Sequence, residues 1–151
     1  MPSVRRADEL DSKDIFDWRN DALTRRMSHS TDLVEWDAHM RWFAASLSNP
    51  NRLLIICEDE NSNAKVAVVR FDIKSVRALI SINLSPNMRG KGKAKQCLKD
   101  SIALFQTICP KVRFIDAEIK PINTASQHSF IGVGFTLLGE KEGVLRYEYV
   151  I

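Results

Sequence analysis

The chain has no apolar run long enough to cross a bilayer, and no hydrophobic segment follows the charged residues near its N-terminus. These two absences predict a soluble, cytoplasmic protein. The net charge is only +3 over 151 residues, which is too small by itself to indicate a nucleic-acid partner. We therefore expect neither a membrane nor a nucleic acid among the partners of the protein.

Cysteine is scarce, and its spacing excludes the common cysteine-based sites. Cys57, Cys97 and Cys109 form no C-x-x-C pair and match no metal-binding spacing, so we expect no metal and three buried free thiols. The patterns G-x-x-x-x-G-K-[ST] and G-x-G-x-x-G are also missing, which disfavours a phosphate-loop NTPase and a dinucleotide site. With 44% hydrophobic and 27% charged residues, the chain fits one globular domain over residues 1–151.

What is present is a mixed pattern of helices and strands, which predicts a fold of the α/β (α+β) class. The expected helices cover about 11–22, 36–48, 94–109 and 123–133. The expected strands cover about 3–6, 53–57, 65–72, 78–84, 114–119, 135–138 and 144–151. Short connections between the second, third and fourth strands predict an antiparallel meander, whereas the long helix after the fourth strand predicts a parallel crossover.

Two local expectations concern the first third of the chain. Residues 23–30 are polar and basic, and we expect them to form a loop. Asp32 with Glu35 resembles a capping box that starts the second helix. On that helix Trp36 and Phe43 follow the apolar stripe and are expected in the core.

A basic, glycine-containing run at residues 89–94 stands between an expected strand and the longest expected helix. Glycines let backbone N–H groups approach a ligand closely, and a helix N-terminus adds partial positive charge. An isolated run of this kind is more often a solvated turn. Its position between a strand and a helix predicts an anion site instead.

Two motifs, in order and on the expected elements, resemble the GNAT (Gcn5-related N-acetyltransferase) superfamily. Arg89-x-x-Gly92-x-Ala94 resembles its acyl-CoA loop, Q/R-x-x-G-x-G/A. The segment 123–135 resembles its closing helix, N-x-x-A-x-x-L-Y-x-x-x-G-F. The resemblance spans essentially the whole chain. It implies a mixed, mainly antiparallel sheet of six to seven strands flanked by about four helices, with a β-α-β unit that binds acyl-CoA.

The resemblance further implies acetyl-CoA as cofactor, with its pyrophosphate on the loop and its pantetheine arm along the preceding strand. Asn83, polar in an otherwise apolar strand, would face that arm or serve as a hydrogen-bonded strand-end residue. The residues expected to bind the cofactor are Ile82, Asn83, Leu84, Arg89, Gly90, Lys91, Gly92, Lys93, Ala94, Asn123, Ser126 and Phe130.

Acetyl transfer to an amine requires a group that takes a proton from the ammonium. Glu118 is the candidate general base, because it precedes Asn123 in the E-x-x-x-x-N spacing of protein-N-terminal acetylating relatives. Strand alternation places it on one face with Phe114 and Asp116. The alternative is a glutamate that is simply exposed.

Other proton-transfer groups are less well placed. His29 is an alternative catalytic candidate because imidazole changes charge near neutral pH, or else a surface residue of the loop. His39 and His128 are expected on the polar sides of their helices. Phe130 occupies the position of a tyrosine that many relatives use as the acid, and it cannot donate a proton. Water, or the proton from the amine, would then serve.

The acceptor is expected over the first two helices. The strings W-R-N-D, T-R-R, H-x-x-W-F and V-V-R-F-D resemble a GNAT subgroup that acts on nucleotide-linked amino sugars of pseudaminic-acid-type pathways. Arginines suit a diphosphate, and an aromatic face suits a uracil or sugar ring. The candidate acceptor-binding residues are Arg19, Asn20, Arg25, Trp42 and Arg70.

Two other functions remain open on the sequence. The protein could acetylate a peptide N-terminus or another small amine, or it could be a catalytically weak acyl-CoA-binding module, as Phe130 suggests. In each case the expected partner is a small molecule or peptide, and the chain would be a monomer or homodimer.

Overall fold

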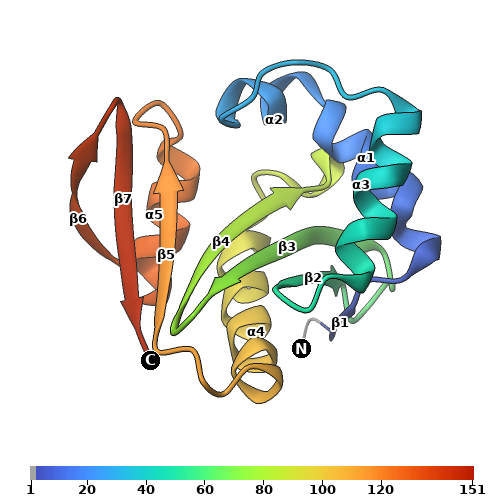
Figure 1. The fold of residues 1–151 in the computed structure, drawn as a ribbon. Helices are drawn as coiled ribbons and strands as arrows, with labels where there is room; N and C mark the ends of the chain where they lie inside the picture. Colours follow the sequence, from blue (N-terminus) through green and yellow to red (C-terminus); the bar gives the residue numbers. More distant parts are fainter. Residues whose placement is uncertain (1–2) are drawn as a thin grey trace.

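The computed structural model of the chain describes residues 3–151, and its seven strands form one sheet in the order β1-β2-β3-β4-β5-β7-β6 (Figure 1). The strands are Ser3–Arg6 (β1), Arg52–Glu58 (β2), Lys65–Lys74 (β3), Arg77–Leu84 (β4), Phe114–Ile119 (β5), Thr136–Lys141 (β6) and Val144–Val150 (β7). The α-helices are Ser12–Asn20 (α1), Ala22–Met27 (α2), Trp36–Ser48 (α3), Lys93–Ile108 (α4) and Thr124–Val133 (α5). Short 3-10 helices are Glu9–Asp11 (η1) and Pro86–Met88 (η2).

The topology follows the connection lengths of the chain. Strands β2, β3 and β4 form the expected antiparallel meander, and β4 pairs in parallel with β5 after the α4 crossover. The β4–β5 pairing is short: it covers only Arg77 to Ile80 on β4. The last four residues of β4 therefore have no partner on the β5 side, and this is where the site described below is built.

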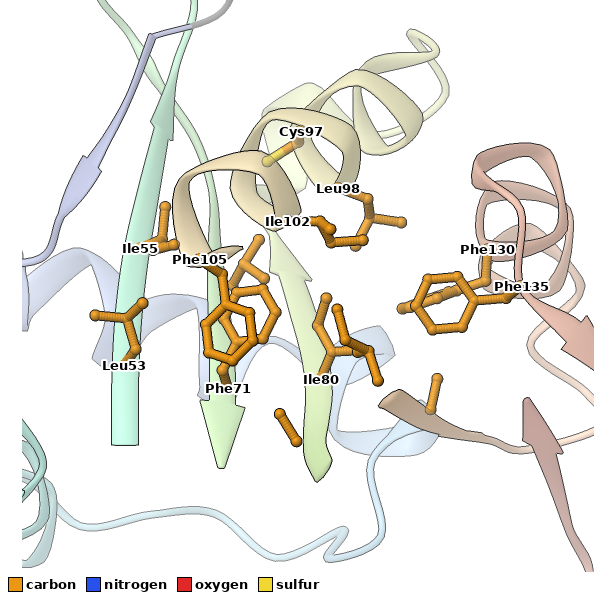
Figure 2. Close-up of a cluster of buried hydrophobic side chains, with 14 of the residues drawn as sticks. Leu53, Ile55, Phe71, Ile80, Cys97, Leu98, Ile102, Phe105, Phe130 and Phe135 are labelled. Carbon is orange, nitrogen blue, oxygen red and sulfur yellow. The ribbon is translucent and has the colours of Figure 1, made fainter. Parts of the chain in front are cut away.

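The two faces of the sheet carry two separate apolar clusters. Helices α4 and α5 cover the larger one, in which Phe71 of β3 stacks on Phe105 of α4 with ring centroids 4.0 Å apart (Figure 2). Helices α1 and α3 cover the smaller one, which contains Ile15, Trp18 and Phe43. The alternation predicted for β5 is confirmed, because its residues are buried on every second position.

The predicted loop at 23–30 is wrong in part, since residues 22–27 form helix α2. Asp21 explains the helix, because its Oδ2 accepts the backbone N–H groups of Leu23 and Thr24 at 3.1 Å each. An aspartate N-cap of this kind satisfies N–H groups that a first helical turn otherwise leaves without partners. The capping aspartate was present in the sequence, but the polar and basic residues that follow it are also typical of a loop.

The predicted capping box before α3 is not formed. Helix α3 begins at Trp36 with Glu35 as its N-cap, and no side chain makes a cap hydrogen bond there. Phe43 lies in the core as expected. Trp36, in contrast, is 40% exposed and packs edge-to-face on Phe16 of α1, with ring centroids 4.9 Å apart, instead of lying in the core.

The prediction of three free thiols is wrong for two of them. Cys57 at the end of β2 and Cys97 in the second turn of α4 form a disulfide, with Cα atoms 5.9 Å apart. Forty residues separate them in sequence, so their proximity comes from α4 packing across β2. Cys109 is free and half-buried, and burial raises the pKa of its thiol.

His39 also differs from expectation, because it is fully buried instead of lying on a polar helix face. Its Nε2 is 2.9 Å from the carbonyl oxygen of Ser12, and aromatic rings of α1 and α3 surround it. Burial lowers the pKa of His39, which favours the neutral ring. No helix within residues 3–151 is long and apolar enough to cross a membrane.

Candidate active site

The loop between β4 and α4 has a backbone conformation that suits an anion. Gly90 and Gly92 have φ angles of 70° and 68°, in the left-handed region that favours glycine. Gly92 is the N-cap of α4 and no side chain caps that helix, so the N–H groups of its first turn face the loop without a side-chain acceptor. No atom lies within 4 Å of a Cβ built on either glycine, so the space above them is free for a ligand. This arrangement fits the pyrophosphate of coenzyme A.

The unpaired end of β4 leads directly into this loop. Ile82 and Leu84 pack towards the α4 core, whereas Ser81 and Asn83 alternate to the opposite face. Backbone groups on the β5 side of this stretch have no strand partner. A ligand arm running along β4 could therefore bond to the main chain as a neighbouring strand would.

The cationic side chains of the loop are used in different ways. The Arg89 guanidinium donates to Asp21 Oδ2 and, at 2.9 Å, to Thr24 Oγ1, so it points to α2. Lys93 pairs with Asp59 at 3.1 Å. Lys91 is exposed and makes no ion pair within the described part of the chain. Of the three, Lys91 is the cation most available to a phosphate.

A cavity of about 250 Å³ lies on the outer side of the loop, next to the β2–β3 turn. The side chains that line it include both disulfide cysteines, Asp59, Lys93 and Gln96. No group of three or more potential metal-ligating side chains within residues 3–151 could hold a metal ion.

The predicted contacts on α5 have structural partners. Asn123 caps α5, because its Oδ1 accepts the backbone N–H of Ser126 at 3.2 Å. Phe130, which was expected to bind the cofactor, is 3% exposed and packs edge-to-face on Phe135, so its ring lies in the core. A hydroxyl at this position would be buried, and Phe130 supplies no acid.

The structure brings the two catalytic candidates together. Glu118 lies near the end of β5, and His29, just after α2, places its Nε2 3.8 Å from Glu118 Oε1. Glu118 is level with Ser81 of β4, one residue beyond the last β4–β5 pair. Both carboxylate and imidazole are partly exposed, so a ligand can reach them.

Three arginines gather on the α1–α3 face of the sheet, around Trp42. Arg19 of α1 lies over the Trp42 ring at 4.5 Å from its centroid, and Arg52 lies over it at 5.6 Å. Arg70 of β3 is the third member, and within residues 3–151 the only carboxylate paired with the group is Asp72. We call Arg19, Arg52 and Arg70 the arginine cluster.

The arginine cluster is electrostatically incomplete. Burial, with the charges of Arg70 and Arg52, lowers the pKa of Arg19. Burial also lowers the pKa of Arg70, and the charge of Arg52 adds to this against the opposing effect of Asp72. Within residues 3–151, Arg19 Nη1 is buried without a hydrogen-bond partner, and Arg70 Nε makes no hydrogen bond but lies 3.3 Å from Asp72 Oδ2 as an ion pair. Burying a polar or charged group without a partner costs free energy of folding, and a bound anion that accepts its hydrogen bonds would offset that cost.

The remaining predicted acceptor contacts serve the backbone. The Asn20 side chain donates to the Val34 carbonyl and accepts its N–H, both at 2.8 Å. Arg25 donates to the carbonyls of Asn20 and Thr31 at 3.2 and 3.1 Å. Both residues therefore organise the segment around α2 and are not part of the arginine cluster.

Sequence reasoning missed Arg52, Asp72 and Asp21. Arg52 and Asp72 are cross-strand partners on β2 and β3, which only the register reveals. The signal for Asp21 was the W-R-N-D string itself, in which a capping aspartate ends one helix and begins another.

Comparison with solved structures defines the class of fold. A domain from Methanocaldococcus jannaschii matches with a TM-score of 0.83 at 20% identity, covering 100% of this chain and 99% of that chain. The spermidine N-acetyltransferase of Vibrio cholerae, solved with CoA and spermine, matches with a TM-score of 0.85 at 16% identity. The match covers 99% of this chain and 95% of that chain. A candidate phosphinothricin N-acetyltransferase matches with a TM-score of 0.80 at 23% identity, and the match covers 99% of this chain and 98% of that chain.

No protein-family model and no curated protein matches the sequence. At these identities the likeness defines the fold, which is that of the GNAT N-acetyltransferases. The expected mixed, mainly antiparallel sheet and its β-α-β unit are thereby confirmed. The expectation of about four helices was one too few, because α2 was not predicted.

Proposed function

We propose that the protein is an acetyl-CoA-dependent N-acetyltransferase that acetylates a primary amine carried by an anionic, nucleotide-linked amino sugar. The observation that carries the proposal is the glycine loop at the uncapped start of α4, directly after a strand end without a β5 partner. This is a place for a pyrophosphate followed by an extended arm. The fold supports the same reaction, because the Vibrio cholerae N-acetyltransferase of this fold was solved with CoA.

Acetyl-CoA supplies an acetyl group activated as a thioester. The residues of the loop would bind its pyrophosphate through backbone N–H groups, with Lys91, which makes no ion pair within residues 3–151, as an additional cation. Backbone N–H groups of residues 82–84 would donate to the carbonyl oxygen that becomes negative during attack. In the overall balance the amine nitrogen gains the acetyl group, the carbon–sulfur bond breaks, and one amine proton leaves.

Glu118 would accept that proton, and His29 beside it would stabilise and relay it. Because Phe130 is buried and has no hydroxyl, the departing sulfur receives no proton from that position. Thiols are acidic enough for a thiolate to leave without a dedicated acid. Water or the proton held at Glu118 completes the balance.

The arginine cluster is the reason for preferring an anionic acceptor. Arg70 of β3, Ser81 of β4 and Glu118 of β5 are level across three neighbouring strands and on the same face. At least two strand spacings, or about 10 Å, separate Arg70 from Glu118, because the pairing of β4 with β5 ends one residue earlier, at Ile80. A diphosphate held by the arginines would therefore place an amine about that far away next to Glu118. Because Trp42 is covered by guanidinium groups, it supports the arginines and does not offer a free face to a base.

An acceptor screen with acetyl-CoA tests the proposal, with release of the CoA thiol as the readout. We expect UDP-linked amino sugars to react faster than spermine or peptides, since a polycation is repelled by the arginine cluster. Arg70→Met should raise the KM for the UDP-sugar on the order of tenfold, the effect of losing one charge-assisted contact. Arg41→Met, an exposed arginine on the same helix as Trp42, is the matched control and should leave KM unchanged.

Glu118→Gln tests the assignment of the base. The rate should fall by roughly 10²- to 10⁴-fold at neutral pH while acetyl-CoA still stabilises the protein against heat. Glu140→Gln, an exposed carboxylate on β6, should behave like the wild type. Turnover that survives Glu118→Gln at every pH would refute the role given to Glu118.

The second candidate is acetylation of a small amine or peptide. It is favoured by the neighbours of this fold, one of which was solved with spermine. Faster reaction of spermine or a peptide than of any UDP-amino sugar would select it. Absence of thermal stabilisation by acetyl-CoA would exclude every acetyltransferase reading, together with the acyl-CoA-binding module. A cytoplasmic location is part of the proposal, because acetyl-CoA would be supplied there.

A further inference from the structure

Arg89 belongs by position to the donor loop, but its side chain belongs to the segment that carries His29. Its guanidinium contacts Asp21 and Thr24 at the start of α2. The hydrogen bond from Arg89 is the main reason that the pKa of Asp21 is lowered, so Asp21 is a carboxylate near neutral pH. The side chains of Arg89 and Asp21 are 29% and 23% exposed, so solvent only partly screens the pair.

Helix α2 depends on such polar contacts because it has no buried residue. At its N-terminus Asp21 Oδ2 accepts from Leu23, Thr24 and Arg89 together. At its C-terminus Lys120, which follows β5, donates to the Arg26 carbonyl at 3.1 Å. The helix therefore extends from the end of β4 to the end of β5, above the gap in strand pairing (Figure 1).

We propose that Arg89 is a positioning residue: by holding Asp21 it fixes α2 across the ends of β4 and β5, and thereby couples binding at the donor loop to the placement of His29 beside Glu118. The proposal rests on the proposed function for what binds at the loop. The anchoring of α2 by Arg89 is independent of that function and can be measured separately.

The coupling has a direct physical path. Arg89 lies three residues before the N-cap of α4, so ordering of the loop around a pyrophosphate also orders the backbone that carries its guanidinium. The guanidinium then fixes Asp21, and α2 carries this constraint to residues 27–29. Linkage requires the reverse effect as well: an acceptor that holds α2 in place must strengthen donor binding by the same factor.

Limited trypsin digestion measures the anchoring without any substrate, because Arg25 and Arg26 lie within α2. Cleavage after them requires α2 to open locally. We expect Arg89→Met and Asp21→Asn each to accelerate it on the order of tenfold, with Arg89→Lys in between. Asn remains a good N-cap, so Asp21→Asn removes the charge and keeps the cap. The double variant should be no faster than either single variant, because both remove the same contact.

Two controls separate this effect from general loosening. Cleavage after Lys13 of α1, a helix held by buried Ile15 and Trp18, should not change in any variant. Lys91→Met removes a loop cation that makes no ion pair with Asp21, and it should leave cleavage within α2 at the wild-type rate when CoA is absent. Unchanged cleavage at Arg25 and Arg26 in Arg89→Met would overturn the anchoring role.

Addition of CoA then tests the coupling. CoA should slow cleavage of α2 in the wild type, and should not slow it in Arg89→Met even where calorimetry shows the variant saturated. In steady-state kinetics Arg89→Met should raise the acceptor KM on the order of tenfold and the acetyl-CoA KM by much less.

The opposite results overturn the coupling in distinguishable ways. Equal protection of both proteins by CoA means that Arg89 does not transmit binding. A raised acetyl-CoA KM with unchanged cleavage means that Arg89 binds the donor directly. If CoA fails to bind the wild type, the proposed function and the coupling are both wrong. The rate of cleavage within α2 in the absence of CoA then still tests whether Arg89 anchors α2.

Discussion

The face of the sheet covered by α4 and α5 is almost wholly apolar, whereas the face covered by α1 and α3 combines a small apolar cluster with buried polar and charged groups. Phe71 and Phe105 are typical of the first face (Figure 2). Asp11, His39 and the arginine cluster are typical of the second. The first face stabilises the chain by excluding water, and the second holds charges in places that a ligand can use.

The largest effect is expected from opening a cavity in the apolar face. Phe105 is fully buried, and Phe105→Ala should lower the free energy of unfolding by about 4 kcal/mol, the usual cost of removing a buried ring. Leu10→Ala is the control, because Leu10 is 86% exposed and should change stability by less than about 0.5 kcal/mol. Urea unfolding followed by tryptophan fluorescence measures both. A small loss for Phe105→Ala would mean that the apolar face tolerates voids and is not the main source of stability.

The next effect comes from a buried charge on the other side of the molecule. Asp11 is fully buried and accepts two hydrogen bonds from Arg5, at 2.8 and 2.9 Å, while Lys65 lies 2.8 Å away. Burial alone would raise the pKa of Asp11, but the hydrogen bonds from Arg5 and Lys65 outweigh it and hold the pKa well below its usual value. Asp11→Asn should cost about 3 kcal/mol, because it removes the buried carboxylate that the two cations share, although Arg5 keeps Glu58 at 2.7 Å and Lys65 keeps Asp14 at 2.9 Å.

The same group predicts how stability depends on pH. Because the folded pKa of Asp11 is depressed, its contribution is complete above the unfolded value near 4 and is lost as the pH falls below it. Acid titration of the unfolding free energy should therefore fall more steeply below about pH 4 in the wild type than in Asp11→Asn. If the unfolding free energies of the two proteins fall in parallel with pH, Arg5 and Lys65 do not lower the pKa of Asp11.

The contrast between the faces also explains what the sequence could predict. Helix α4 and the buried positions of β5 were predictable, since apolar periodicity is a local signal that tertiary packing only reinforces. Asp11 and His39 were not, because nothing local distinguishes a charged residue that is buried with partners from one that is solvated. The partners of Asp11 come from β1 and β3, which the chain brings together only when folded.

The candidate site shows the same division. The glycine loop was predictable because Gly90 and Gly92 readily adopt the positive φ angles that the loop requires. The direction of the Arg89 side chain could not be predicted, because it depends on its contact with α2. Helix α2 has six residues, which is less than two helical turns and too short to show an apolar periodicity. The approach of His29 to Glu118 follows from α2 in turn.

The disulfide allows a second test on the apolar face, of intermediate size. Reduction of Cys57–Cys97 by a dithiol should lower the free energy of unfolding by about 2 to 3 kcal/mol, because it releases a 40-residue loop in the unfolded chain. The variant Cys57→Ser with Cys97→Ser should be equally destabilised and insensitive to the dithiol. If reduction leaves stability unchanged, packing of α4 on β2 holds these elements together without the bond.

The smallest effect has the opposite sign and comes from the arginine cluster. Arg19→Met removes a desolvated guanidinium whose pKa is lowered by burial and by Arg70 and Arg52, while methionine preserves most of the contact with Trp42. The variant should be as stable as the wild type or more stable by up to about 1 kcal/mol, since an unpaired buried charge opposes folding. With CoA added in excess to occupy the glycine loop, pyrophosphate should raise the melting temperature of the wild type further and not that of Arg19→Met, because only the complete cluster offers the anion three cations. A clear loss of stability in Arg19→Met without any anion would show that the cluster is structural, and that the charged face of the sheet was built for folding and not for an acceptor.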